Sequence, residues 1–194
     1  MWLASLRHCL AGLARFSGRD GPARFWPYTG TLFGIAMAFW SIYMGTLMSG
    51  MFARMRAFAR THPDQVTVEQ GPGHYSMQIH GSHPELMPDF ASALTVIAVI
   101  SLCFIVMVAA AAARRLHDSG IPGWVGLVPV VFLLSGFWLM RGVFGSMDTG
   151  AEPDFDRFLL IFGNNLVYLI CLGVLAYLLA RKGTPGDNRY GPPG

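Results

Sequence analysis

Four long stretches of this chain contain no charged side chain. They cover residues 25–53, 90–113, 119–140 and 158–180, with lengths of 29, 24, 22 and 23 residues. A helix rises about 1.5 Å per residue, so about 20 apolar residues cross the roughly 30 Å hydrocarbon core of a bilayer. Because the stretches lack the short alternating segments of a membrane barrel, the pattern predicts four transmembrane helices.

A short amphipathic helix is predicted ahead of the first span, over residues 1–16. At about 100° per residue, one side collects apolar side chains, and the opposite side carries His8 and Arg15. The apolar side chains are Trp2, Leu3, Leu6, Leu10 and Leu13. Two locations fit this pattern: the helix lies in the headgroup region of the membrane, or its apolar side packs on the protein's own helices.

The segment between the first two spans, residues 54–89, is the longest polar part of the chain. Residues 65–70 and 74–80 alternate apolar and polar side chains around the turn sequence GPG, which predicts a β-hairpin. The segment also holds four of the six histidines: His62, His74, His80 and His83. The last three are weak candidates for a transition metal, because their spacing matches no recognised metal motif. We favour a solvated loop without a metal.

These patterns together define the predicted fold class, an all-α membrane protein. Four transmembrane helices are preceded by a short amphipathic interfacial helix, and a small β-hairpin lies in the outer loop between spans 1 and 2. Hydrophobic residues make up 53% of the 194 positions and charged residues 13%, which fits one membrane domain over residues 1–194. The three cysteines, Cys9, Cys103 and Cys171, are an odd count with two inside spans, so no disulfide framework is expected.

The distribution of basic residues predicts which side faces the cytoplasm, where Lys and Arg are retained. The side with both termini carries nine basic residues and three acids, and the opposite side carries five basic residues and eight acids. Three arginines directly after the first span favour the reverse orientation. We expect a bacterial inner-membrane protein with a periplasmic loop at 54–89 and a cytoplasmic tail at 181–194. The second outer segment, 141–157, is acidic, and Asp154 is a candidate cap for the helix that follows.

Two features inside the spans bear on how the helices associate. The first span carries a line of small residues at spacings of three and four: Gly30, Gly34, Ala38, Ser41, Gly45 and Ser49. Such a line permits close helix packing, within the molecule or in a dimer, and we favour packing within the molecule. In the fourth span, Asn164 and Asn165 are the only side-chain amides inside any span, and we expect them to hydrogen-bond to another helix.

Three short polar blocks stand on the predicted cytoplasmic side. They are residues 16–26 (FSGRDGPARFW), 114–124 (RRLHDSGIPGW) and 183–192 (GTPGDNRYGP). Their order and content resemble the signature of a bacterial inner-membrane family known as domain of unknown function 805. In that family an F-x-G-R block leads into aromatic residues at the first span. An R-R-L-H-D block follows the second span, and a G-T-x-G-x-N-x-[FY]-G tail closes the chain.

The resemblance covers nearly the whole chain apart from the outer loops. The matching residues are Phe16, Gly18, Arg19, Phe25 and Trp26 in the first block, Arg114, Arg115, Leu116, His117, Asp118 and Trp124 in the second, and Gly183, Thr184, Gly186, Asn188, Tyr190 and Gly191 in the third. This chain has Arg24 where the family usually has an acid, and Val125 where a second aromatic residue is common. The resemblance implies location and architecture, but no activity.

Two interpretations account for polar blocks at the membrane surface. In the first they are anchors and caps without a ligand, because cations complement the dipole at a helix end and Trp26 and Trp124 suit the headgroup belt. In the second, charged residues converge on an anionic group, either a lipid headgroup or a phosphorylated carrier. The converging set is Arg19, Arg114, Arg115, His117 and Asp118.

The sequence offers little for catalysis or transport. It contains no nucleophile elbow, no phosphate-binding glycine loop, no paired carboxylates inside a span and no HExxH zinc motif. The predicted function is therefore non-catalytic and without a cofactor: organising partners or binding anionic lipid headgroups at the cytoplasmic membrane surface. Membrane lipids are the expected partners, with other membrane proteins and a homo-oligomer as further candidates, and no nucleic acid. A small transporter or channel subunit is the alternative, and a phosphate-handling membrane enzyme is a weaker one.

Overall fold

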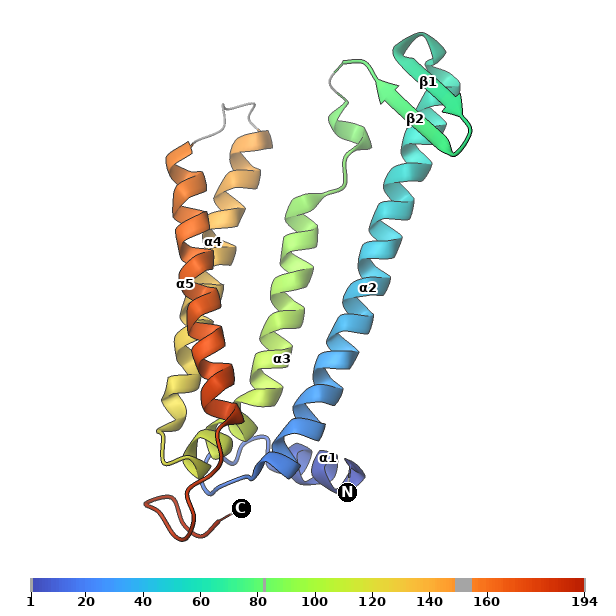
Figure 1. Ribbon diagram of the computed structural model, residues 1–194. Coiled ribbons are helices and arrows are strands. Elements are labelled where there is room, and N and C mark those ends of the chain that lie inside the picture. The colour runs from blue at the N-terminus through green and yellow to red at the C-terminus, as the bar shows by residue number, and fades with distance from the viewer. Residues whose placement is uncertain (1, 82, 149–154, 194) are drawn as a thin grey trace. The chain divides into compact units, whose positions relative to one another are not determined.

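Two compact units make up the chain, one of residues 1–36 and 91–194 and the other of residues 37–90. The structure, a computed structural model, describes residues 2–81, 83–148 and 155–193 (Figure 1). The prediction of a single membrane domain stays a prediction. The candidate cap Asp154 lies outside the described residues.

Five α-helices lie in the described part of the chain: α1 (Trp2–Ala11), α2 (Pro22–Thr61), α3 (Phe90–Asp118), α4 (Val128–Asp148) and α5 (Phe155–Ala180). Segments long and apolar enough to cross a membrane lie in α2, in α3, in α4 with the short turn that precedes it, and in α5. The predicted fold class is confirmed. The chain has four long apolar helices, a short helix before them, and a two-stranded antiparallel sheet.

Helix α2 extends beyond the uncharged stretch that predicted it. It has 40 residues and ends at Thr61, well after Ala53. Met, Ala and Arg residues in this extension are good helix formers, and the helix ends just before Pro63, which restricts the residue ahead of it. At about 1.5 Å per residue the helix is about 60 Å long, so it reaches beyond a hydrocarbon core of roughly 30 Å.

The turn after α3 is set by glycine. Gly120 has a φ of +74°, a region that glycine enters without strain, and its N–H donates to the His117 carbonyl at 3.0 Å. The Ile121 N–H donates to the Leu116 carbonyl at 3.0 Å, which completes a glycine-terminated helix cap. A 3₁₀ turn over Gly123–Leu127 follows, and α4 begins at Val128.

Helices α4 and α5 run side by side in the first unit (Figure 1). Asn164 of α5 joins them, since its amide nitrogen donates to the Phe132 carbonyl at 2.9 Å. The Asn164 oxygen accepts a hydrogen bond from the Ser135 hydroxyl at 2.6 Å. Asn165 is exposed instead, because consecutive helical residues diverge by about 100°. Of the two amides predicted to pair with another helix, Asn164 reaches one.

The buried core of the first unit lies at one end. It combines residues of α1, the start of α2, and the ends of α3 and α5: Cys9, Phe25, Tyr28, Ala111, Leu116 and Leu179. The Tyr28 hydroxyl donates to the Met107 carbonyl at 2.8 Å, so its polar group is satisfied inside the core. Elsewhere the long helices expose many large apolar side chains, as expected of surfaces that contact lipid.

The line of small residues in α2 faces open space. A Cβ placed on Gly30, Gly34 or Gly45 would have no atom within 4 Å. The close helix packing that we favoured for this line is therefore not formed by the described residues at these three positions.

The second unit combines the later part of α2 with a β-hairpin. Strand β1 (Val66–Gly71) pairs antiparallel with β2 (His74–Ile79), and Val66 lies opposite Ile79. The predicted hairpin is confirmed, with strand ends that differ by at most one residue. Just beyond the strands, the His80 N–H donates to the Gln65 carbonyl at 2.8 Å.

Candidate functional site

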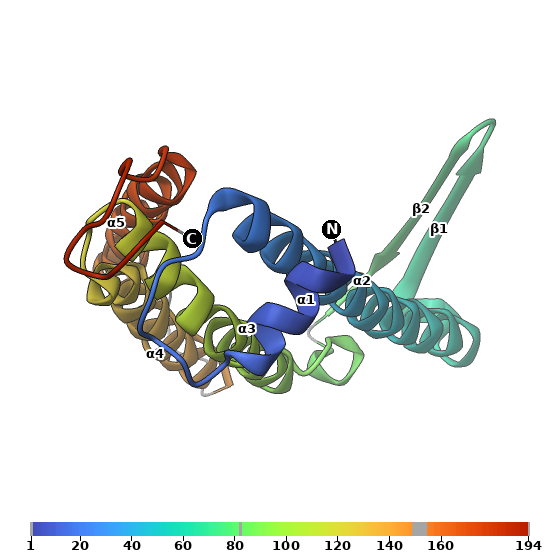
Figure 2. The ribbon, with the colours of Figure 1, turned by 90° about the horizontal axis from the view of Figure 1, so that it is seen from below.

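The three polar blocks of the sequence come together at one end of the first unit. This end holds α1, which lies across it (Figure 2), together with the start of α2, the last turns of α3 and the tail after α5. Five charged side chains from these segments form what we call the arginine–aspartate cluster: Arg19, Asp20, Arg114, Arg115 and Asp118. Each is 6% exposed or less. Because buried charges are costly unless paired, their partners decide what the cluster can do.

Arg114 joins the end of α1 to the segment before α2. Its Nε donates to the Asp20 carboxylate at 2.5 Å. Its Nη1 donates to the carbonyl of Gly12 at 2.8 Å and to the carbonyl of Arg15. A cation at this position complements the negative end of the helix dipole. Helix α1 ends at Ala11, short of the predicted residue 16, and Arg114 contacts the carbonyls just beyond this end.

Arg115 makes a similar contact with α5. Its Nη1 donates to the Asp118 carboxylate at 2.7 Å, and its Nη2 donates to the carbonyl of Arg181, directly after the last residue of α5. Adjacent residues on a helix point about 100° apart, so Arg114 and Arg115 reach two different helix ends. Through this pair of arginines, α3 ties α1 and α5 together.

Arg19 holds the C-terminal tail. Its Nε donates to the Asp118 carboxylate at 3.1 Å. Its Nη1 donates to the carbonyls of Gly186 at 2.8 Å and Gly191 at 3.1 Å. Its Nη2 donates to the carbonyls of Asp118 at 3.3 Å and Thr184 at 2.8 Å. A guanidinium has five N–H donors, so the donors of Arg19 are all engaged within the protein.

Asp118 is the centre of the cluster. Its carboxylate accepts hydrogen bonds from Arg19 and Arg115, and its carbonyl accepts from the N–H of Thr184 at 2.8 Å and from the Thr184 hydroxyl at 3.2 Å. The tail passes directly against it at Gly183, where a Cβ would overlap the Asp118 carboxylate. Glycine alone permits this close approach of the backbone.

His117 packs against the tail and does not face the two aspartates. Its ring stacks on the Tyr190 ring, with 3.8 Å between centroids and 8° between planes. Its Nδ1 donates to the Gly18 carbonyl at 3.2 Å. The Asn188 amide donates to the His117 carbonyl at 3.0 Å and to the Thr184 hydroxyl at 2.9 Å. The ring is therefore a packing surface for the tail.

Helix α1 is docked through its small and polar residues. Ser5 and Cys9 are buried, and the Ser5 hydroxyl donates to the Arg24 carbonyl. His8 Nε2 donates at 2.9 Å to the Asp20 carboxylate, which thereby joins α1 to the cluster. Burial raises the pKa of the Cys9 thiol, and the nearby Asp20 carboxylate adds to this effect.

Most of the apolar side of α1 is exposed. Trp2, Leu3 and Leu10, and Leu13 just after the helix, are each at least 36% exposed, whereas Leu6 is partly buried against the core. The Trp2 indole N–H donates to the hydroxyl of Thr31, several residues into α2, at 3.0 Å, so this side is turned toward the first span. The location of the helix stays a prediction, since Leu6 and Trp2 contact the protein while Leu3 and Leu10 are exposed.

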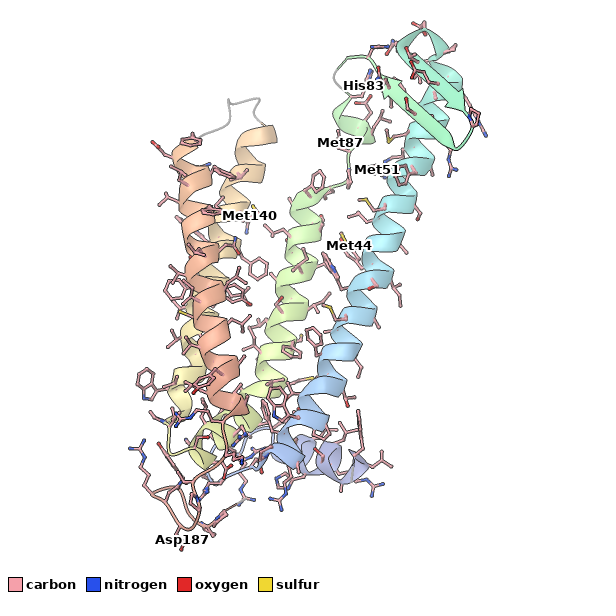
Figure 3. The ribbon with its side chains drawn as sticks, viewed as in Figure 1. Met44, Met51, His83, Met87, Met140 and Asp187 are labelled. Atoms are coloured by element: carbon pink, nitrogen blue, oxygen red, sulfur yellow. The ribbon has the colours of Figure 1, made fainter. Side chains whose placement is uncertain are left out.

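A second set of basic side chains at this end is exposed. It consists of Arg7, Arg15, Arg24, Arg181, Lys182 and Arg189. In the described polar segments of this end, the one exposed acid is Asp187, labelled in Figure 3. Three aromatic residues of the family blocks, Phe16, Trp26 and Trp124, are exposed as well. The end therefore buries paired charges and exposes an excess of cations beside aromatic rings.

The structure brings four of the five predicted anion-binding residues together and gives them protein partners. Arg19 and Arg115 share the Asp118 carboxylate, and Arg114 turns to Asp20. An anion entering the cluster would have to displace carboxylates and main-chain carbonyls. Our sequence reasoning missed Asp20, although its position is a usable signal: it is the lone acid in a basic, glycine-rich segment directly before a span.

The cluster is arranged to tie segments together. Three arginines and two aspartates leave one positive charge, and Arg114 Nη2 and Arg115 Nε are buried without an acceptor among the described residues. The Gly12 backbone lies against Arg114 Nη2, since a Cβ added to Gly12 would be 3.3 Å from that nitrogen. The remaining guanidinium donors point at carboxylates and at carbonyls just after α1, just after α5 and in the tail. The geometry is that of a structural joint.

The histidines of the second unit have local partners. His80 Nε2 lies 2.9 Å from the Thr67 hydroxyl, and His83 Nδ1 lies 3.0 Å from the Glu85 carboxylate. A backbone hydrogen bond and the contact with His83 lower the pKa of the Glu85 carboxyl. No group of three metal-ligating side chains is found among the residues that the structure describes, and the side chain of His74 is outside them.

The fold and the site define a class: a multi-pass α-helical membrane protein whose polar end is an interlocked charged joint. More particularly, the chain belongs to the family described as Protein of unknown function (DUF805), which matches residues 13–192. The match confirms the resemblance drawn from the three polar blocks, and it covers all three. No curated protein and no solved structure matches the chain.

Proposed function

We propose that this protein is a non-catalytic, multi-pass protein of the bacterial inner membrane whose charged end binds anionic lipid headgroups at the cytoplasmic surface. There it presents a fixed platform to membrane partners. The observation that carries the proposal is the division of basic residues at that end. The buried arginines are engaged by Asp20, Asp118 and main-chain carbonyls, whereas six other basic side chains are exposed.

The exposed cations suit an anionic bilayer surface. Each Lys or Arg close to such a surface contributes about 1 kcal/mol of attraction. The exposed apolar side of α1 offers a means of lying in the headgroup region, and Trp26 and Trp124 suit the aromatic belt at the same depth. The same excess of basic residues supports placing this end, with both termini, in the cytoplasm.

The arginine–aspartate cluster has a positioning role in this proposal. Arg19, Arg114 and Arg115 hold the tail, α1 and α5 in place, and the exposed basic residues meet the lipid. A role in conduction is less well supported, because both polar atoms of the Asn164 amide are engaged with α4. An amide used in this way serves helix packing.

Lipid retention tests the proposal. The full chain is reconstituted into nanodiscs of mixed phosphatidylglycerol and phosphatidylcholine, and the lipids that stay bound after gentle release are identified by native mass spectrometry. One variant, Arg181→Gln, Lys182→Gln and Arg189→Gln, removes exposed cations of the proposed lipid site. We expect its preference for phosphatidylglycerol to fall by about tenfold or more.

A matched triple variant provides the control. Arg54→Gln, Arg56→Gln and Arg60→Gln removes three exposed arginines of the second unit, and we expect its lipid preference to stay close to that of the unmodified protein. An unchanged preference in the tail variant would refute lipid binding at the charged end. An equal loss in both variants would mean that net charge, and not this end, determines the preference.

A further inference from the structure

One side of α5 carries a regular pattern that the rest of the described chain does not cover. Its residues alternate at spacings of three and four: Phe155, Phe158, Phe162, Asn165, Leu169, Leu172 and Ala176. This is the a and d spacing of a heptad repeat, in which one helix meets another along a seam. All seven residues are exposed. We call this side the Asn165 seam.

The Asn165 seam is separate from the side of α5 that packs on α4. The packed side consists of positions one residue earlier along most of the helix, and all of them are less exposed: Ile161, Asn164, Tyr168, Cys171 and Leu175. The rotation of about 100° between consecutive residues separates the two sides. Helix α5 therefore has one seam in use and a second that is free in the described structure.

Aromatic rings order the first half of the Asn165 seam. The rings of Phe155 and Phe158 stack with 6.3 Å between centroids, and those of Phe158 and Phe162 with 6.5 Å. Each of the three side chains is at least 60% exposed. A ladder of rings that is already ordered loses little side-chain freedom when a partner covers it, which favours association.

The polar residue at the centre of the seam distinguishes it from an ordinary lipid-facing surface. Asn165 lies near the middle of α5, a helix long and apolar enough to cross a membrane. Among the described residues its amide has no hydrogen-bond partner, in contrast to the neighbouring Asn164. An amide facing hydrocarbon without a partner is costly, and such residues usually mark an association between helices.

We propose that the Asn165 seam is a dimerisation surface, and that its occupant is α5 of a second copy of this chain. Membrane insertion gives every copy the same orientation, so two α5 helices that meet run parallel. In a parallel pair each a or d position faces the same position of the partner. The amide of Asn165 then meets Asn165 of the partner subunit, and each supplies the donor that the other's oxygen accepts.

The chemistry of the seam favours a second copy over an unrelated helix. An amide is complementary to itself, and so are the rings and leucines on either side of it. In a symmetric dimer, each of these side chains lies at the same depth in the membrane as the same side chain of the partner subunit. A single polar residue in an otherwise apolar seam also fixes the register of the pair, because any shift along the axis leaves the amides unpaired.

Disulfide crosslinking in native membranes tests the seam directly. In a chain with Cys9, Cys103 and Cys171 replaced by alanine, single cysteines are introduced by Phe162→Cys, Leu169→Cys and Leu172→Cys, which leave Asn165 in place. Two control cysteines, Leu166→Cys and Ile170→Cys, stand on an exposed side of the same helix at similar depth. We expect dimers from the first three and none from the controls. Equal crosslinking at all five positions, or none at any, would overturn the proposal.

A substitution at the centre tests the role of the amide. Asn165→Leu is expected to weaken association about tenfold, measured by energy transfer between labelled copies as they are diluted with lipid. Asn165→Gln, which keeps the amide, should restore most of the association. Undiminished association of Asn165→Leu would overturn the proposed pairing. If the leucine variant does not fold, the crosslinking at Phe162 and Leu169 still decides whether the seam forms the dimer.

Discussion

The charged end of the first unit and the histidine loop of the second contain similar kinds of polar side chain, but they use them differently. In the first, Arg19 and Asp118 are 99 positions apart and both are almost fully buried. In the second, His83 and Glu85 are two positions apart, and the Glu85 side chain is 60% exposed. The contact between Arg19 and Asp118 joins distant segments of the chain, whereas the contact between His83 and Glu85 joins two residues of the same loop.

The two regions show which charges hold this protein together. Removing one partner of a buried ion pair leaves an uncompensated charge in a poor solvent, at a cost of about 3–5 kcal/mol. Water solvates both partners of an exposed pair, so that pair contributes little. Substitutions of similar chemistry in the two regions should therefore have very different effects.

The largest effect is expected for Asp118→Asn. This change removes the carboxylate that Arg19 and Arg115 share, and we expect the free energy of unfolding to fall by about 3–5 kcal/mol. Thermal unfolding in detergent measures the loss, and tryptic cleavage after Arg181 and Lys182 measures release of the tail. Glu85→Gln in the exposed pair is the control and should show no measurable loss. Comparable losses in the two variants would contradict the different roles assigned to the buried and the exposed carboxylate.

A smaller loss, about 3 kcal/mol, is expected for Asp20→Asn, because its carboxylate neutralises one arginine of the cluster and not two. Asp20 also holds His8, so α1 should leave its docked position more often. Alkylation of Cys9, with Cys103 and Cys171 replaced by alanine, reports this motion. We expect slow alkylation in the unmodified background and faster alkylation with Asp20→Asn. Equal rates would mean that Asp20 does not hold α1.

Gly183→Ala tests the fit of the tail against Asp118. The added methyl group would overlap the Asp118 carboxylate, and we expect a loss of about 1–3 kcal/mol, as for overpacking elsewhere. Gly163→Ala in α5 is the matched control, since nothing lies within 4 Å of its added Cβ. That variant should be neutral or slightly more stable, because alanine favours a helix over glycine. A stable Gly183→Ala variant would argue against the close approach.

The Cys9 thiol gives a modest pH dependence of the docked end. Its pKa is raised in the folded protein, so the folded state keeps the proton that the unfolded chain loses above about pH 8.5. This contribution to stability is present in full below that pH and is lost as the pH rises through the folded pKa. Unfolding of the unmodified chain and of Cys9→Ala, compared from neutral to alkaline pH, measures it. A Cys9→Ala variant with the same alkaline loss would contradict the assignment.

The smallest effect is expected in the histidine loop. His83→Gln should lower the free energy of unfolding by about 1 kcal/mol, because the exposed partner Glu85 is solvated when the contact is lost and mainly the packing of the His83 ring on Phe58 is removed. Zinc should not raise the unfolding temperature, since His80 and His83 contact different partners. A zinc-dependent rise that His83→Gln abolishes would instead point to a metal site and would remove the contrast between the two regions.

Much of the fold was predictable because its signals are local. The uncharged stretches predict spans by length alone, and the alternation around Gly71 and Gly73 predicts the hairpin. The element ends were less predictable. Helix α2 continues to Thr61 because charged side chains do not prevent a helix outside the hydrocarbon core, and α1 ends at Ala11 where Arg114 contacts the carbonyls that follow.

The sequence alone determined that the chain has four apolar spans, three polar blocks and the family to which these belong. It could not determine which atoms the arginines bind, and the tertiary structure decided this. Arg114 meets Asp20 across 94 positions, and Arg19 meets Gly191 across 172. Local patterns describe what a segment can form by itself, whereas the pairing of a buried charge depends on which distant segments exclude water around it.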